Sequence, residues 1–197
     1  DSTRNADSAD WADMEKCMSM VRRLHQSGIT VAHSFDIRER ISFYEKLCRS
    51  HGALLFEDYE EVKGWMDWLM DTLDSMERPK CLCHIDANVD NFLFFEDGSV
   101  KLLDWEYAGM CDPVMDVSMC AIYSYYKEED MERLFRLYLR REPSEDELFA
   151  LYANAALGGF LWCLWAVYKS ILGDEFGEYT IIMYRYAKKY YRKLRKL

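Results

Sequence analysis

The sequence has 197 residues, of which 50% are hydrophobic and 15% aromatic, so it can bury one sizeable core and is not a disordered chain. Its formal net charge of -10 argues against general nucleic-acid binding, because neutralising phosphates requires a basic face. An acidic chain instead favours a metal-bound nucleotide or a cationic small molecule as its ligand. The 7 cysteines are odd in number and widely scattered, so we expect free thiols in a reducing compartment.

The chain opens with the polar segment DSTRNADSAD, which is rich in residues that break regular structure. Residues 1–10 show no signal-peptide pattern and are interpreted as a linker or boundary segment of a cytosolic protein. Apolar residues at helical spacing then predict a first helix over residues 11–26. Asp36 is placed to cap a second helix, and Asp58 likewise precedes a third helix over residues 59–76.

Three histidines of this part of the chain, His25, His33 and His51, have no ligand spacing among them. We interpret each of them as a surface or packing residue. The pair Cys81-x-Cys83 could be half of a zinc site, but no second Cys or His pair follows at the spacing of a zinc finger. Buried apolar thiols are the favoured interpretation of that pair.

The most informative stretch covers residues 81–116, CLCHIDANVDNFLFFEDGSVKLLDWEYAGMCDPVMD. Its acids outnumber its single base, Lys101, and they lie among apolar residues. The acids are Asp86, Asp90, Glu96, Asp97, Asp104, Glu106, Asp112 and Asp116. A carboxylate that leaves water without a partner is unstable, so the cluster needs cations from elsewhere. Bound metal is the first candidate.

A short strand over residues 81–85 is predicted to lead into a loop, HIDANVDN, that is rich in Asp and Asn. Residues 92–95 and 100–103 then predict a hairpin turned by the dipeptide Asp97-Gly98. With a two-residue loop, Asn91 would face Asp104 at a Cβ separation of about 5 Å. An amide oxygen beside a carboxylate, with Asp86 close by, suits Mg²⁺.

These residues also carry a family resemblance. The pattern H-x-D-x-x-x-x-N, followed by a hairpin and D-W-E-Y, resembles the catalytic segment of the choline kinase and aminoglycoside phosphotransferase group, relatives of the protein kinases. The resemblance implies that Asp86 is the catalytic base and that Asn91 and Asp104 hold Mg²⁺ on ATP. It also implies that His84 supports the loop and that Asp116 hydrogen-bonds to it from the start of the next helix.

After Pro113 the pattern predicts four more helices or helical segments: an apolar one, a mixed-charge one over residues 127–141, a long one that begins at residues 143–146, and a basic C-terminal one. The apolar run over residues 155–167 is too short for a membrane span and is interpreted as part of a core helix. We therefore expect no membrane span.

Trp162 and Trp165 lie three residues apart and so share one face of the long helix. Stacked aromatic faces are what a quaternary ammonium ligand needs, at about 0.5 to 2 kcal/mol for each desolvated contact. The segment W-x-x-W followed by E-F-G also resembles the part of choline kinases that forms the choline cage. By the same resemblance Tyr107 would add a wall, Asn88 would contact the substrate, and Glu106 would attract the ammonium group or assist the metal. Further candidate walls are Tyr123, Tyr179 and Tyr184.

The expected fold is α+β and mostly α-helical, the C-terminal lobe of a protein-kinase-like fold with a small catalytic β-hairpin region. Residues 11–197 would form this substrate-binding and catalytic lobe, and the N-terminal nucleotide lobe of the family is absent from the chain. The full-length parent would use ATP and Mg²⁺ to phosphorylate the hydroxyl of choline or a related amino alcohol. We expect these 197 residues alone to be inactive, because half of the phosphate-binding apparatus is missing.

Two alternatives stay open. The acceptor could be another small alcohol, such as an aminoglycoside, thiamine or a sugar, since the catalytic segment is shared across the group. The chain could also be a non-catalytic choline-binding module or a pseudokinase, although a pure binder has no use for a base such as Asp86. The sequence does not decide between choline and ethanolamine, and it leaves the oligomeric state open.

Overall fold

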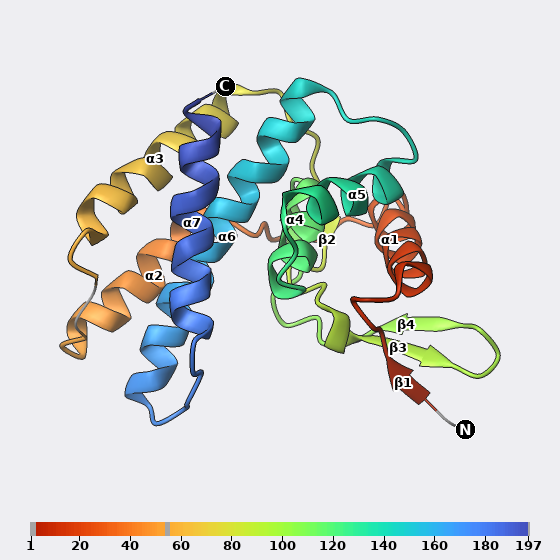
Figure 1. Cartoon of the computed structure of the whole chain (residues 1–197), viewed down its shortest axis with the longest axis horizontal. Coiled ribbons are helices and arrows are strands. Elements are labelled where there is room, and N and C mark those ends of the chain that lie inside the picture. The colour runs from red at the N-terminus through yellow and green to blue at the C-terminus, as the bar shows by residue number, and fades with distance from the viewer. Residues whose placement is uncertain (1–2, 54–55, 197) are drawn as a thin grey trace. The chain divides into compact units, whose positions relative to one another are not determined.

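The computed structural model describes residues 3–53 and 56–196 and divides the chain into two compact units. The first unit comprises Asp1–Phe35 and Pro79–Leu151, and the second comprises Asp36–Arg78 and Tyr152–Leu197. Helices predominate in the described residues and two small sheets accompany them (Figure 1). The predicted α+β, mostly helical class is confirmed.

Both sheets belong to the first unit. One sheet has the strand order β1-β3-β4 and is antiparallel throughout, with β1 at Thr3–Asn5, β3 at Phe92–Phe95 and β4 at Val100–Leu102. The other pairs β2 (Cys81–Cys83) with β5 (Gly109–Cys111). The strands β3 and β4 match the predicted hairpin closely, whereas β1 and β5 were not predicted.

The strand β1 lies inside the segment that we interpreted as a linker. It is held by Arg4, whose guanidinium pairs with the buried carboxylate of Asp13 and lies 4.7 Å from the centre of the Phe94 ring. Because a three-residue strand has no strong local pattern, only these distant partners reveal it.

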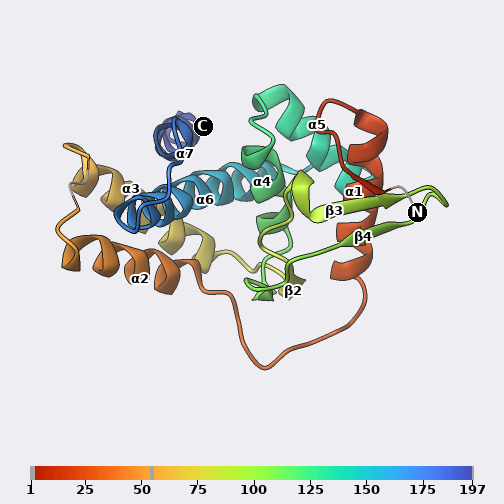
Figure 2. The same ribbon diagram turned by 90° about the horizontal axis from the view of Figure 1, so that it is seen from below.

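Three helices pack around these strands, namely α1 (Trp11–His25), α4 (Val114–Tyr123) and α5 (Glu128–Leu139). Helix α1 contacts α5, β2 and β4, and Figure 2 shows it running beside the hairpin. Helix α4 is buried on every side from Val114 to Ile122, as expected of a helix that is apolar all round. The site described below is built on the start of α4 and the end of α1.

The long helix α6 (Glu145–Ile171) begins with a capping box. The Glu147 backbone N–H donates to the Ser144 hydroxyl at 3.2 Å, and the Glu147 carboxylate accepts from the Ser144 N–H at 2.9 Å. The same carboxylate receives two hydrogen bonds from Arg141, which lower the pKa of Glu147 to about 2.

We expect Glu147→Gln to lower the free energy of unfolding by about 1 kcal/mol near neutral pH. The pKa of Glu147 is depressed in the folded chain, so this stabilisation is complete above about pH 4.3, the ordinary value for glutamate, and is lost as the pH falls through about 2. Urea unfolding of both proteins across that range measures the difference. A difference in the free energy of unfolding that stays constant as the pH falls would contradict a stabilising role for the ionised Glu147 carboxylate.

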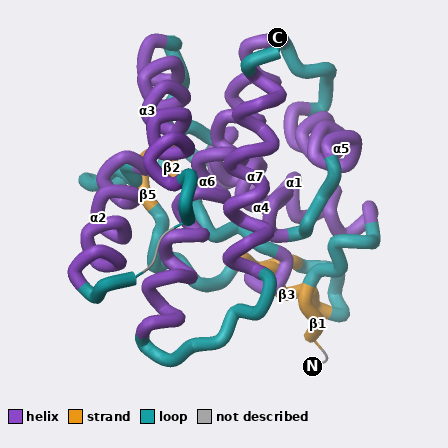
Figure 3. The backbone as a smooth tube through the Cα atoms, turned by 60° about the vertical axis from the view of Figure 1, so that its left-hand side comes forward, coloured by secondary structure: helices purple, strands orange, loops and turns teal. Residues whose placement is uncertain are grey.

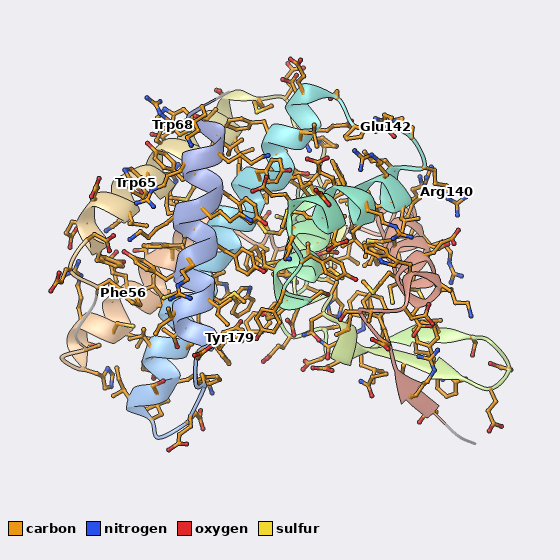
Figure 4. All side chains as sticks on the ribbon, viewed as in Figure 1. Phe56, Trp65, Trp68, Arg140, Glu142 and Tyr179 are labelled. Carbon is orange, nitrogen blue, oxygen red and sulfur yellow. The ribbon has the colours of Figure 1, made fainter. Side chains whose placement is uncertain are left out.

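The second unit consists of α2 (Ile37–Ser50), α3 (Tyr59–Ser75), the part of α6 from Tyr152 onward, and α7 (Tyr179–Leu194), and Figure 3 shows the helices in purple. Close packing of α6 on α7 requires Gly159, because a Cβ there would lie 2.6 Å from the Met183 carbonyl oxygen. Trp65 of α3, labelled in Figure 4, belongs to this unit. Its ring stacks on that of Tyr191 of α7 at 4.7 Å between centroids.

The predicted caps of the first two helices of this unit have different outcomes. Asp36 caps α2, since its carboxylate accepts from the N–H groups of Arg38 and Glu39. Asp58 precedes α3 at its N-cap position, as predicted, but its side chain makes no capping hydrogen bond. Its carboxylate instead accepts a hydrogen bond from the Tyr184 hydroxyl at 2.9 Å and pairs with Lys188.

Helix α6 extends well beyond the apolar run that we considered too short to span a membrane. Its 27 residues are long and apolar enough by length and composition, yet 83% of the apolar window is buried inside the protein. The apolar residues of α6 are therefore explained by their burial in the folded core.

Candidate active site

The hairpin of the predicted metal site has a different register from the one we expected. Phe94 pairs with Val100 and Phe92 with Leu102, so the loop has three residues, Glu96 to Gly98, rather than two. The reason is Gly98, whose φ of +81° completes a three-residue loop that ends in a left-handed residue. Asn91 consequently faces Leu103, whose N–H donates to the Asn91 carbonyl oxygen at 2.9 Å.

Asp104 therefore does not stand opposite Asn91, and that expectation was wrong. Asp104 is the residue after Leu103, the partner of Asn91, and it adopts a left-handed φ of +61°. In a regular strand a shift of one residue would turn the side chain to the other face of the ribbon. Asp104 instead lies outside the regular strand in a left-handed backbone conformation, which Asp tolerates better than most residues.

Asp86 is the most tightly held carboxylate of the loop. Its two oxygens accept hydrogen bonds from the Asn88 side-chain amide at 3.1 Å and from the Asn91 side-chain amide at 2.9 Å. Burial raises the pKa of Asp86, although hydrogen bonds from Asn88, Asn91 and Tyr123 oppose that effect. A carboxylate with a raised pKa is a stronger proton acceptor than an ordinary one, which suits it to general-base chemistry.

The backbone immediately before Asp86 is strained. Ile85 has a φ of +72°, which is a genuine outlier for a β-branched residue and costs about 1 to 3 kcal/mol. The carboxylate of Asp116 offsets this cost by accepting the N–H of Ile85 at 2.6 Å and the N–H of His84 at 2.8 Å. Asp116, from the first turn of α4, thus hydrogen-bonds to the backbone of the loop that carries Asp86.

Asp116 has a further partner that the sequence did not reveal. His25 Nε2 lies 2.9 Å from Asp116 Oδ2, and His25 Nδ1 lies 2.9 Å from the Tyr138 hydroxyl. Burial by itself would lower the pKa of His25, but the hydrogen bond and charge of Asp116 outweigh it and raise that pKa. Our interpretation of His25 as a surface or packing residue missed this role, because 91 residues separate the two partners.

His84 is fully buried and supports the loop from the side of the hairpin. Its Nε2 lies 2.7 Å from the carbonyl oxygen of Leu103, the residue that precedes Asp104. The edge of its ring also contacts Trp105 at 4.8 Å between centroids. The hydrogen bond from His84 Nε2 to Leu103 therefore connects the loop that carries Asp86 to the residue that follows β4.

Asn91 and Asp104 are the residues that could hold a divalent ion. The Asn91 side-chain nitrogen donates two hydrogen bonds to Asp86, one to its carboxylate and one to its backbone oxygen at 2.8 Å. The amide oxygen of Asn91 is therefore directed away from that carboxylate. The Asp104 side chain is exposed. A carboxamide oxygen and a carboxylate are hard ligands, so this donor set fits Mg²⁺ completed by phosphate and water oxygens.

The other predicted substrate contacts lie in both units. In the first unit Asn88 donates to Asp86 and also accepts the Asp90 N–H at 2.9 Å, while Tyr107 is half-buried and Glu106 exposed. In the second unit Trp162 is 3% exposed and meets the edge of the half-buried Trp165 at 5.8 Å. Trp165 also contacts the Phe176 ring at 5.0 Å and lies 5.8 Å from the Lys169 ammonium group, so its face already receives a cation.

A loop that presents an aspartate held by two side-chain amides, together with an amide and a carboxylate of the kinds that bind a divalent ion, is typical of kinase-like phosphoryl-transfer proteins. A model of the phosphotransferase enzyme family matches residues 6–152. The chain belongs to this phosphotransferase enzyme family and is choline/ethanolamine-kinase-like within it.

Individual relatives agree with this assignment. Protein LicA of Haemophilus influenzae is 25% identical over 180 residues, which cover 85% of this chain and 52% of that protein. The crystal structure of choline kinase LicA from Streptococcus pneumoniae is 26% identical, with a TM-score of 0.85, and the match covers 98% of this chain and 68% of that one. A structure of LicA in complex with AMP matches with a TM-score of 0.86 at 26% identity, over 98% of this chain and 67% of that one. The chain thus spans about half the length of the curated relative.

Proposed function

We propose that this chain carries the catalytic segment of an ATP- and Mg²⁺-dependent kinase that phosphorylates the hydroxyl of choline or a related amino alcohol. The observation that carries the proposal is the support of Asp86, whose carboxylate is fixed by two amides and whose backbone is held by Asp116. Membership of the phosphotransferase family and the similarity to choline kinase LicA support the class of reaction and of acceptor. The AMP complex of LicA supports an adenine nucleotide as the donor.

In this mechanism Asp86 accepts the proton of the acceptor hydroxyl as that oxygen attacks the terminal phosphoryl group. The hydrogen bonds from Asn88 and Asn91 fix the direction of the carboxylate, so little reorganisation is needed when the alcohol arrives. Asn91 and Asp104 would hold Mg²⁺, which when bound offsets the negative charge of the phosphates. The same Asn91 amide thus orients the base through its nitrogen and would bind metal through its oxygen.

The acceptor is tested on the full-length parent protein, because we expect the present residues alone to be inactive, by measuring ADP release from Mg-ATP with a panel of alcohols: choline, ethanolamine, an aminoglycoside, thiamine and a sugar. We expect choline or a close amino alcohol to give the highest kcat/KM. A higher value for an aminoglycoside, thiamine or a sugar would reassign the acceptor. Tight choline binding by calorimetry without turnover of any alcohol would favour a binding module instead of an enzyme.

Trp165→Ala is expected to raise the KM for choline about tenfold, because one desolvated cation–π contact contributes about 0.5 to 2 kcal/mol. Trp165 suits this test better than the buried Trp162, whose loss would leave a cavity in the second unit. Trp68→Ala, which removes another half-buried tryptophan of that unit, is the matched control. An unchanged KM for choline in the Trp165 variant would remove this residue from the acceptor site.

A further inference from the structure

A second cluster of potential ligands lies in the first unit. His25 at the end of α1 and the two cysteines of β2, Cys81 and Cys83, each offer one ligand atom, and these three atoms all lie within 4.8 Å of one another. The sequence suggested only half of a zinc site here, because the histidine comes from a helix 56 residues earlier in the chain (81 − 25). Contact between α1 and β2 supplies the missing third ligand.

The spacing of the two sulfurs matches metal coordination. Cys81 Sγ and Cys83 Sγ are 3.8 Å apart, on the same face of a strand in which residues two apart point the same way. Two thiolates bound about 2.3 Å from a tetrahedral zinc ion are separated by about 3.8 Å. The sulfurs therefore need little movement to share one ion.

His25 has the carboxylate partner that a metal-binding histidine usually has. Its Nε2 is held by the carboxylate of Asp116, which is the usual support for a histidine that binds metal through its other nitrogen. That other nitrogen, Nδ1, now contacts the Tyr138 hydroxyl at 2.9 Å. Exchange of this one neutral contact for a metal bond would leave Asp116 and its hydrogen bonds to the catalytic loop in place.

We propose that Cys81, Cys83 and His25 Nδ1 form a binding site for a thiophilic divalent ion such as Zn²⁺ or Cd²⁺. On binding, both thiols release their protons to solvent, and the two thiolates neutralise the charge of the ion. This balance makes a largely buried site feasible, since an uncompensated charge there would be costly. Cys81 is only partly buried and gives the ion access, and a water molecule can occupy the fourth position.

This site differs from the proposed magnesium site in chemistry and in effect. Its sulfur and imidazole ligands select soft ions, whereas the oxygen ligands of Asn91 and Asp104 select hard ones. An ion here would join α1 to β2 and would fix the His25 ring against Asp116. We therefore expect the ion to stabilise the fold around the catalytic loop.

The test uses the purified protein, reduced with a phosphine and freed of metal with a chelator, and titrates it with Cd²⁺ in competition with a chelator of known affinity. We expect one equivalent of Cd²⁺ to bind, with the ultraviolet charge-transfer absorption of cadmium thiolates and a higher midpoint of thermal unfolding. Cys81→Ser and His25→Gln are each expected to weaken binding at least about 100-fold. Cys17→Ala, which removes a buried cysteine of α1 outside the cluster, should bind as the wild type does.

Tyr138→Phe tests whether His25 binds the ion through Nδ1, because the substitution removes the hydroxyl that contacts this nitrogen. This variant should bind Cd²⁺ at least as tightly as the wild type, and weaker binding would contradict ligation through Nδ1. Equal affinity in the wild type and in His25→Gln, or no charge-transfer absorption in the wild type, would overturn the proposal. None of these readouts depends on kinase activity, so the result stands apart from the proposed function.

Discussion

Asp86→Asn in the full-length parent protein is expected to lower kcat by a factor of about 100 to 10,000, the range that a general base contributes. Asparagine keeps the shape of aspartate but cannot accept the proton of the attacking alcohol. Its side chain can still accept one of the two amide hydrogen bonds, so the fold of the loop should survive. Steady-state release of ADP at saturating choline and Mg-ATP measures the effect, and circular dichroism confirms that the variant is folded.

Asp90→Asn is the matched control for this experiment. Asp90 belongs to the same loop and is exposed, so the substitution removes an equal charge without touching Asp86. We expect its kcat to stay within about twofold of the wild type, in line with the small effects of surface substitutions. Equal losses in the two variants would indicate a general effect of charge, and an active Asp86→Asn protein would exclude this residue as the base.

Asp116→Ala is expected to lower the free energy of unfolding by about 3 to 5 kcal/mol, the usual effect of breaking a buried charge pair. The substitution leaves the N–H groups of His84 and Ile85 and the ring of His25 without their acceptor. It also removes the contact that holds Ile85 in its strained conformation, so the loop before Asp86 should relax. Urea unfolding monitored by tryptophan fluorescence gives the change in free energy.

Asp71→Ala is the control for this second experiment, because Asp71 pairs with Arg38 at the surface, where both side chains are exposed. An exposed pair contributes about 1 kcal/mol or less, so this variant should be nearly as stable as the wild type. A similarly small effect in Asp116→Ala would mean that the buried contacts of Asp116 do not hold the loop. Amide hydrogen exchange of Ile85 would then separate a local change from a global one.

The loop around Asp86 shows how the two sets of contacts serve different purposes. Asn88 and Asn91 act on the carboxylate itself and come from the next five residues of the chain. Asp116, His84 and His25 act on the backbone and on each other, and they connect the loop to α4, the hairpin and α1. Asn88 and Asn91 fix the direction of the Asp86 carboxylate, and the more distant residues fix the position of the loop.

Sequence patterns were sufficient to predict the features that depend on neighbours along the chain. The helices follow from apolar spacing and from breakers such as Pro113, the strands β3 and β4 follow from alternation around Gly98, and the spacing of His84, Asp86 and Asn91 carried the resemblance to the family. Each of these signals lies within a few residues, where local sterics and hydrogen bonding decide the conformation.

The features that depend on contacts between distant segments became apparent only in the folded chain. Folding placed β1 and β5 in their sheets and brought His25 to both Asp116 and the cysteines of β2. A short strand or a single histidine carries no local pattern that distinguishes one partner from another. The packing of α1 against β2 selects those partners, because burial and hydrogen bonding of the whole unit fix which residues meet.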